Sequence, residues 1–219
     1  MFTQAQKKEV IKYGKKLVDY NLTSGTGGNI SLYDPKDKEI LITPSGFDFY
    51  EMTEEDLVII DLEGNVLEAK SGQKPSSEWM MHGVFYKNRE DLQAIIHAHT
   101  VYGTVLSCLR EPLKPTHYMV AVAGEDIRVA EYATFGTEQL SRNAYEAMRD
   151  RKAVILANHG ILGGEINLDK AFNVIEEVEY CSKIYCIAKS VGDPVILDRD
   201  EMEVMKHKFQ NYGKNVKKH

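Results

Sequence analysis

The spacing of the apolar segments constrains the fold of this chain more than any other feature, because it changes along the sequence. In the first part, short apolar runs follow one another with turn signals between them, such as Asp34-Pro35 and Glu63-Gly64-Asn65. Consecutive strands with connections this short pair antiparallel. We therefore predict antiparallel strands over residues 30–33, 39–43, 57–62 and 66–69.

The second part of the chain alternates helices with short buried strands. Apolar residues at helical spacing predict the helices, two of which begin at the capping residues Thr3 and Thr137. Strands first in a run and then mixed with helices are typical of a layered α/β domain with a largely antiparallel sheet. The predicted helices are 3–20, 77–88, 102–109, 137–149, 168–190 and 201–210, and the further strands are 94–98 and 153–157.

Composition excludes several classes of protein. The 219 residues carry a net charge of −6 and 43% apolar residues, unlike a disordered chain or a basic, non-specific nucleic-acid binder. No apolar run approaches the ~20 residues of a membrane-spanning helix, and the N-terminal segment lacks the apolar stretch of a secretory signal. Cys108, Cys181 and Cys186 are predicted to be reduced, buried thiols. We expect a cytoplasmic, single domain over residues 1–219 that binds neither nucleic acid nor membrane.

The histidines are the most informative residues. His97 and His99 flank Ala98 at the end of a predicted strand, so both imidazoles point to one face. His159 ends another predicted strand and converges with them if the two strands end at the same sheet edge. Glu78, at the start of a predicted helix, is the candidate fourth ligand of a zinc ion. Chance placement of packed histidines remains open on spacing alone, and His82 is interpreted as a packed or hydrogen-bonded neighbour.

Three polar loops could bind an oxyanion. The glycine-rich loop at residues 25–29 fits neither a dinucleotide fingerprint nor a Walker loop, but its glycines expose backbone N–H groups beside Asn29. The loop at 43–46 contains two hydroxyls and a glycine, and Ser76-Ser77 precedes a predicted helix. A plain turn and a helix N-cap are the alternatives. Together with a metal, the loops describe a site for a small phosphorylated carbonyl compound.

These residues belong to motifs that resemble the class II aldolase and epimerase superfamily in order and spacing. The small departures from the pattern, at Gly27, Ala98 and Asn158, remove no ligand. The motifs are GTGGN (25–29), TPSG (43–46), PSSEW (75–79), HAH (97–99), HYMVAVAG (117–124), YATFGT (132–137) and NHG (158–160).

The resemblance implies an α/β/α sandwich that assembles as a homotetramer with active sites at the subunit interfaces. It implies one zinc ion per subunit, held by Glu78, His97, His99 and His159. It also implies that Tyr118 is an acid, that Tyr212 in the C-terminal tail (201–219) reaches the aldehyde end of the substrate, and that Phe135 lines the same region. The residues it implies for phosphate binding are Gly28, Asn29, Ser45, Gly46, Ser76 and Ser77.

The activity that the resemblance implies is that of a metal-dependent aldolase. The expected reaction is reversible cleavage of L-fuculose 1-phosphate to dihydroxyacetone phosphate and L-lactaldehyde, with Glu78 as the base. The enzyme alternatives are an L-ribulose-5-phosphate 4-epimerase and a methylthioribulose-1-phosphate dehydratase; Glu78 and Tyr212 favour the aldolase. A non-catalytic adducin-like module is expected to have lost ligands, and structural zinc sites are usually rich in cysteine.

Overall fold

The computed structural model describes residues 2–211, in which eight strands form one sheet in the order β4-β3-β2-β1-β5-β8-β7-β6. Every neighbouring pair is antiparallel except β6 and β7, which are parallel. The prediction of a largely antiparallel sheet is confirmed. The strands are β1 Asn29–Asp34, β2 Glu39–Ile42, β3 Val58–Asp61, β4 Val66–Glu68, β5 Ala94–Ala98, β6 Val129–Ala130, β7 Ala153–Leu156 and β8 Gly160–Glu165.

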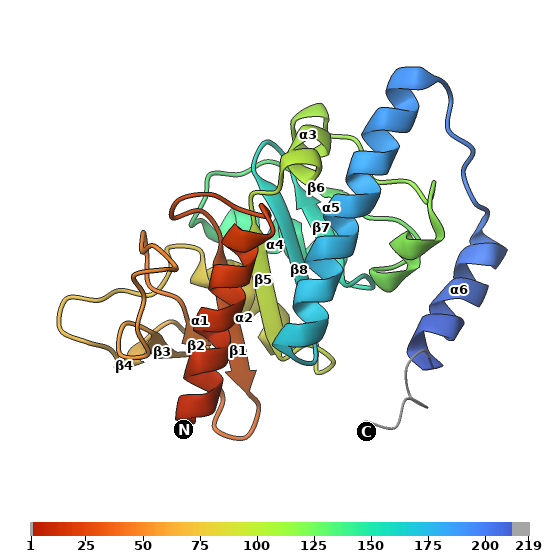
Figure 1. Ribbon diagram of the computed structural model, residues 1–219. Coiled ribbons are helices and arrows are strands. Elements are labelled where there is room, and N and C mark those ends of the chain that lie inside the picture. The colour runs from red at the N-terminus through yellow and green to blue at the C-terminus, as the bar shows by residue number, and fades with distance from the viewer. Residues whose placement is uncertain (1, 212–219) are drawn as a thin grey trace, which may run out of the picture.

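Helices cover both faces of this sheet, so the predicted α/β/α sandwich is confirmed (Figure 1). Side chains alternate between the faces: Leu41 joins the core under α1 and α5, whereas Ile40 and Ile42 join the core under α2 and α4. The helices are α1 Gln4–Asp19, α2 Trp79–Asn88, α3 Val101–Leu109, η1 Tyr118–Val122, α4 Glu138–Met148, α5 Leu168–Val191 and α6 Arg199–Asn211.

Side-chain caps fix where three of the helices begin. The Thr3 hydroxyl accepts the Gln6 amide N–H, and the Gln6 side chain accepts the Thr3 amide N–H, which completes the predicted capping box of α1. At the start of α4 the Thr137 hydroxyl accepts the Leu140 amide N–H, and at the start of α5 the Asn167 side chain accepts the Lys170 amide N–H. Each cap satisfies a backbone donor that the first turn of a helix leaves without a partner.

Three elements were not predicted: β6, β8 and the short helix η1. β8 contains Gly160, Gly163 and Gly164, and glycine is depleted in strands. The fold explains one of these glycines, because a Cβ on Gly163 would lie only 3.0 Å from side-chain atoms of Ile175 and Val174 on α5. β8 therefore owes its strand conformation to pairing with β5 and β7, not to local propensity.

Both outer strands of the sheet are short. β4 has three exposed residues and pairs with β3 through a register shift between Ile59 and Ile60. Glu68 in β4 also forms an ion pair with Lys7 of α1, with Nζ and Oε1 2.6 Å apart. β6, at the other edge, has two residues.

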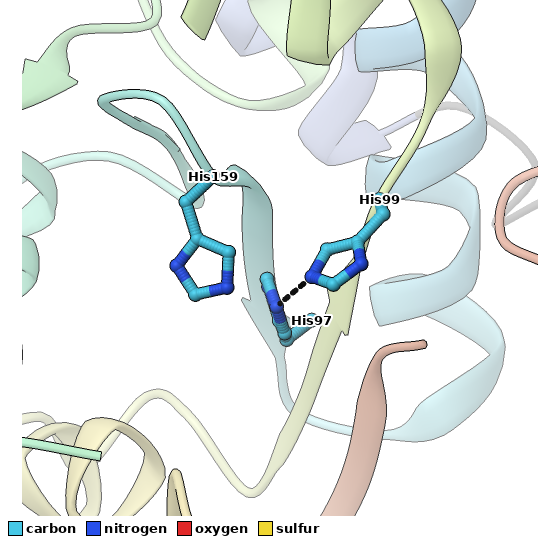
Figure 2. A group of neighbouring side chains, drawn as sticks. All are labelled: His97, His99 and His159. Carbon is cyan, nitrogen blue, oxygen red and sulfur yellow. Dashed lines mark hydrogen bonds between the residues drawn. The ribbon is translucent and has the colours of Figure 1, made fainter. Parts of the chain in front are cut away.

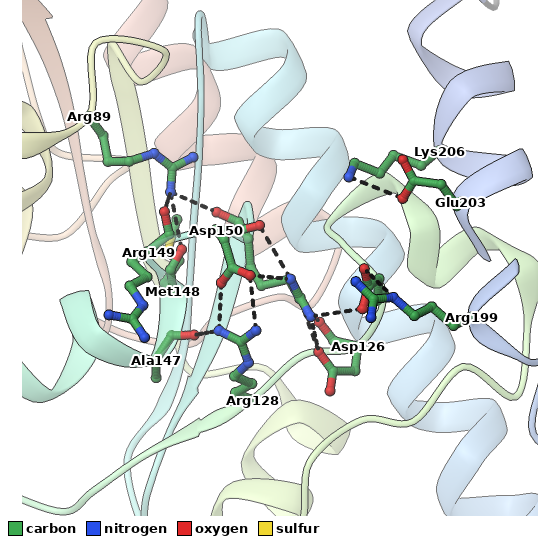
Figure 3. Close-up of polar contacts among 12 residues, drawn as sticks. Arg89, Asp126, Arg128, Ala147, Met148, Arg149, Asp150, Arg199, Glu203 and Lys206 are labelled. Atoms are coloured by element: carbon green, nitrogen blue, oxygen red, sulfur yellow. Dashed lines mark hydrogen bonds and ion pairs between the residues drawn. The ribbon is translucent and has the colours of Figure 1, made fainter.

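Hydrogen bonds and ion pairs of arginine side chains join the C-terminal ends of α2 and α4 (Figure 3). The Arg89 guanidinium donates to the backbone carbonyls of Met148, Arg149 and Arg151 at 3.1, 2.7 and 3.1 Å, which satisfies carbonyls at the end of α4. Arg151 is 8% exposed and its guanidinium bonds Asp150 at 2.7 Å. Pairing of this kind compensates for the burial of the arginine charge.

The structure also bears on the predictions about membrane-spanning helices and about the cysteines. No helix among residues 2–211 is long and apolar enough to span a membrane. All three cysteines are free, as predicted, but only Cys181 is buried. Cys108 is exposed, because it lies on the side of α3 that faces away from the buried residues Leu106 and Ser107.

Candidate active site

Three histidines lie together at one edge of the sheet (Figure 2). His97 is in β5, His99 follows that strand, and His159 is in the turn between β7 and β8. β8 pairs antiparallel with both β5 and β7, so these two strands run parallel and end at the same edge. One ring nitrogen of each histidine lies within 4.8 Å of the others. The side chains converge as predicted, although His159 is in a turn and not at the end of the strand.

A backbone carbonyl holds His97 in the tautomer that presents Nε2 to a metal. His97 Nδ1 lies 2.8 Å from the Ile161 carbonyl oxygen, which can only accept, so Nδ1 carries the proton and Nε2 presents its lone pair. Burial, and then the proximity of His159 and His99, lowers the pKa of His97 well below its usual value. Burial also lowers the pKa of His99. Neutral imidazoles are the protonation state that metal binding requires.

Glu78 adds a carboxylate to the three imidazoles as a possible metal ligand. Its Oε2 lies 3.5 Å from His97 Nε2, and its Oε1 lies 3.4 Å from His159 Nε2. Oε1 is buried and has no hydrogen-bond partner among residues 2–211. A buried carboxylate oxygen without a donor is unfavourable unless a cation or another donor satisfies it. The residues therefore fit a metal ion bound by three imidazoles and one carboxylate.

Exposure increases from the floor of this cluster to its mouth. His97 is fully buried, His159 is partly buried and His99 is exposed. Structural zinc sites are closed, whereas catalytic sites keep a side that water or substrate can reach. The open side of the cluster is thus the arrangement that a catalytic metal requires.

Ser107 of α3 fixes the turn that contains His159. Its Oγ accepts the His159 amide N–H at 2.8 Å and donates to the Leu156 carbonyl at 2.5 Å, which bridges the two ends of the turn. The Ser107 carbonyl also accepts the amide N–H of Asn158, which has a positive φ of 52°. Ser107 therefore holds a metal-site histidine without contacting the site itself.

We expect the Ser107→Ala substitution to destabilise the protein by roughly 1–3 kcal/mol, because it removes two buried side-chain hydrogen bonds, while the His159 N–H and the Leu156 carbonyl keep the 3.1 Å bond to each other. Metal affinity should weaken by about tenfold, as is usual when a supporting hydrogen bond is removed. Thermal unfolding and chelator competition measure the two effects. Ser182→Ala is a matched control, because Ser182 is equally buried but its hydroxyl has no hydrogen-bond partner within residues 2–211. Equal behaviour of both variants would contradict the assigned role.

Two of the predicted polar loops lie side by side at the same edge of the sheet. The Ser45 amide N–H donates to the Lys74 carbonyl at 3.1 Å, and the Ser76 amide N–H donates to the Thr43 carbonyl at 3.0 Å. Pro44 and Pro75 form a bridge between them. Ser45, Gly46 and Ser77 are exposed there. The hydroxyl groups of Ser45 and Ser77 are therefore accessible to a ligand.

The glycine-rich loop lies against the histidine cluster. Gly28 has a φ of 80°, and a Cβ at this position would lie 2.5 Å from the His97 carbonyl oxygen, so only glycine fits. Asn29 and Ser76, both predicted to bind phosphate, are buried and contact Glu78. Asn29 Nδ2 donates to Glu78 Oε2 at 2.9 Å, and Ser76 Oγ accepts the Glu78 amide N–H at 3.3 Å. The loops thus support Glu78 as well as exposing N–H groups.

The remaining predicted site residues are separated from the cluster or lie outside the described chain. Phe135 is 65% exposed, in a loop whose Gly136 packs against the Ser77 carbonyl. Tyr118 begins η1, which packs on α5 and α6, and its ring stacks on His117 and Phe209. The structure therefore groups Tyr118 with the C-terminal helix. Tyr212 lies outside the described residues.

Sequence reasoning missed Ser107, and it interpreted His82 only as a neighbour. No local motif singles out Ser107, because the turn that it holds is about 50 residues further along the chain. His82 is fully buried and hydrogen-bonded, as the interpretation required.

The fold and the donor set agree with the family to which this chain belongs. Residues 8–186 match the family described as the Class II Aldolase and Adducin N-terminal domain. The chain is a class II aldolase, a class whose substrates are sugar phosphates and which is generally metal-dependent.

The chain is similar over nearly its whole length to two curated aldolases and one solved structure. The chain is 45% identical over 213 residues to the 5-deoxy-D-ribulose 1-phosphate aldolase of Bacillus thuringiensis serovar kurstaki, with 97% of this chain and 99% of that protein covered. It is 37% identical to the L-fuculose phosphate aldolase of Escherichia coli O157:H7, with 95% and 96% covered. A solved L-fuculose 1-phosphate aldolase superimposes with a TM-score of 0.94 at 58% identity, with 96% and 98% covered.

Proposed function

We propose that the protein is a zinc-dependent aldolase that cleaves L-fuculose 1-phosphate to dihydroxyacetone phosphate and L-lactaldehyde. The observation that carries the proposal is the position of Glu78, whose unpartnered Oε1 faces the histidine cluster beside the polar loops. The similarity to solved and curated fuculose phosphate aldolases supports this substrate. Histidine and carboxylate donors with an open side support one zinc ion per subunit.

A second substrate is favoured by a specific relative. The Bacillus thuringiensis protein, 45% identical, is a 5-deoxy-D-ribulose 1-phosphate aldolase. Cleavage of that five-carbon ketose between C3 and C4 also gives dihydroxyacetone phosphate, but with acetaldehyde as the second product. The two candidates share the phosphorylated half and differ only in the aldehyde.

In the proposed reaction the chain's own groups move protons and hold the phosphate. In cleavage the C3–C4 bond breaks, Tyr118 takes the proton of the C4 hydroxyl, and Glu78 returns a proton to C3. The ion, when bound, supplies Lewis-acid polarisation of the ketose oxygens. The proposed phosphate-binding groups orient the shared half of the substrate; they are Gly28, Asn29, Ser45, Gly46, Ser76 and Ser77. Phe135 and Tyr212 are proposed to line the aldehyde end.

The proposal is tested by offering the zinc-loaded protein three substrates: L-fuculose 1-phosphate, 5-deoxyribulose 1-phosphate and L-ribulose 5-phosphate. Release of dihydroxyacetone phosphate with the highest kcat/KM from the first supports the proposal, and preference for the second replaces it with the second candidate. Formation of D-xylulose 5-phosphate from the third would identify an epimerase. No reaction with any of them would favour a binding module of the adducin type.

We also propose a homotetramer with active sites between subunits. One supporting observation is an apolar stripe on α3, where Val101, Val105 and Leu109 are 63%, 40% and 65% exposed at intervals of four residues. The other is that the ring of the proposed acid, Tyr118, stacks on His117 and on Phe209 of α6, so it is held at the C-terminal helix. Light scattering of the purified protein measures the assembly directly, and a monomer would contradict it.

The Tyr118→Phe substitution tests whether residues from two subunits form one active site. We expect it to slow aldol turnover strongly while proton exchange at dihydroxyacetone phosphate stays near wild type, because the tyrosine serves only the aldehyde half. If Tyr118 reaches a neighbouring subunit, co-expression with the inactive Glu78→Gln variant restores activity in mixed oligomers. Random assembly predicts recovery of about a quarter of the wild-type rate. No recovery in mixed oligomers would place Tyr118 outside the shared site.

A further inference from the structure

A stripe of polar side chains runs between β1 and α2, through a part of the structure that is otherwise apolar. Asn29, Ser31 and Tyr33 alternate along β1 and so share one face of the sheet. Facing them are Glu78 at the start of α2 and, at successive intervals of four residues, His82 and Tyr86. Two residues of a strand and four of a helix advance by about the same distance, ~6–7 Å, so the rows stay in register.

Short hydrogen bonds connect this stripe into a single chain. Tyr86 Oη lies 2.6 Å from Ser31 Oγ, and Ser31 Oγ lies 2.6 Å from His82 Nδ1. His82 Nε2 lies 2.6 Å from Asn29 Oδ1, and Asn29 Nδ2 donates to Glu78 Oε2 at 2.9 Å. All five side chains are buried.

The Glu78 carboxylate lies at one end of this series of hydrogen bonds and determines which partner donates in each of them. A carboxylate can only accept, so the Asn29 amide nitrogen faces Glu78 and its oxygen faces His82. His82 Nε2 must therefore carry a proton. Burial lowers the pKa of His82 to about 3, so the ring is neutral and its Nδ1 accepts the Ser31 hydroxyl proton. Each donor from Ser31 onward points toward Glu78.

The two oxygens of Glu78 are unequal as a result. Oε2 accepts the Asn29 amide, whereas Oε1 has no hydrogen-bond partner among the described residues and lies 3.4 Å from His159 Nε2. Fixing one oxygen restricts rotation of the carboxylate. The other oxygen is then directed at the histidine cluster.

We propose that His82 is a positioning residue, which acts through Asn29 to hold Glu78 Oε2 so that Oε1 is the oxygen presented to the metal and the substrate proton. This inference rests on the proposed function in one respect, that Glu78 is both a metal ligand and the base. Ser31 and Tyr86 extend the same network and fix the orientation of the His82 ring. Without the His82 donor, the Asn29 amide is free to rotate and the carboxylate loses its fixed orientation.

Two substitutions at one position separate positioning from packing. His82→Gln keeps an N–H donor and an acceptor in the cavity, whereas His82→Met has nearly the same volume but offers no donor and only a weak acceptor. We expect His82→Met to weaken zinc binding by about 10–100-fold, the usual effect of losing a supporting hydrogen bond. Its kcat should fall by a larger factor than KM rises, because the substitution disturbs Asn29 but leaves other proposed phosphate-binding groups, such as Ser45 and Ser77, untouched. His82→Gln should restore most of both properties.

Zinc affinity is measured by chelator competition on the folded proteins, alongside thermal unfolding and steady-state kinetics. Equal zinc affinity and kcat in His82→Met and His82→Gln would overturn the proposal, as would wild-type values in His82→Met. A loss of thermal stability alone, with zinc affinity and kcat unchanged, would show a merely structural residue and also overturn it.

A direct reading of the tautomer separates this inference from the proposed function. In protein labelled with 15N-histidine, the ring of His82, assigned by its loss in His82→Gln, should show a protonated Nε2 and a bare Nδ1 at neutral pH. A protonated Nδ1 would overturn the network. If wild-type protein cleaves none of the three substrates but shows this tautomer and the zinc difference, the proposed function fails while the network stands.

Discussion

Removal of the metal is expected to abolish aldol cleavage. A Lewis acid contributes several kcal/mol to transition-state stabilisation, and each ~1.4 kcal/mol corresponds to about tenfold in rate. We therefore expect at least about a thousandfold loss of activity after dialysis against a strong chelator, measured as release of dihydroxyacetone phosphate. His97→Ala should have the same effect, because it removes the buried donor at the floor of the cluster.

Zinc addition is the control for the chelation experiment. It should restore the wild-type chain but not the His97→Ala variant, and Mg²⁺ should restore neither, because imidazole donors favour zinc over magnesium. Zinc should also raise the Tm of the wild-type protein by binding only the folded state. Full activity in a verified metal-free preparation would contradict the proposed mechanism.

The second large effect is expected for Glu78→Gln. The substitution preserves the shape of the side chain but removes its ability to accept a proton, and a positioned base contributes about 10²–10⁴-fold. Deuterium uptake into dihydroxyacetone phosphate, followed by NMR, measures the proton transfer without the aldehyde step. We expect zinc to be retained in part and exchange to fall by about that factor.

Tyr118→Phe provides the comparison for this measurement. The two variants should both be slow in the full aldol reaction but differ in proton exchange, which only Glu78→Gln should lose. Exchange near the wild-type rate in Glu78→Gln would show that another residue is the base.

Elements with strong local signals could be predicted from the sequence. The strand at residues 94–98 was predicted with the bounds that the structure has, because a short apolar run is interrupted on both sides by polar residues. The caps of α1 and α4 were predicted from Thr3 and Thr137. β8 could not be predicted, because glycine is depleted in strands and the close approach of α5 to Gly163 appears only in the folded structure.

Only part of the candidate site could be predicted from the sequence. The convergence of His97, His99 and His159 followed from strand periodicity and the idea of a common sheet edge. The hydrogen bonds made by Ser107 and His82 could not be predicted, because they depend on how α3 and α2 are placed against distant strands. The location of Tyr118 on η1 depended likewise on the packing of α6.

The short outer strands of the sheet limit how copies of this protein can associate. A long exposed edge would offer a row of free N–H and C=O groups to another chain. Here three residues of β4 and two of β6 leave too little backbone to continue the sheet from one copy into the next. The contacts in the proposed tetramer are therefore expected to be side-chain contacts, such as those of the apolar stripe of α3. Such contacts close into an oligomer of fixed size when they repeat around a symmetry axis, whereas growth along a sheet edge has no natural end.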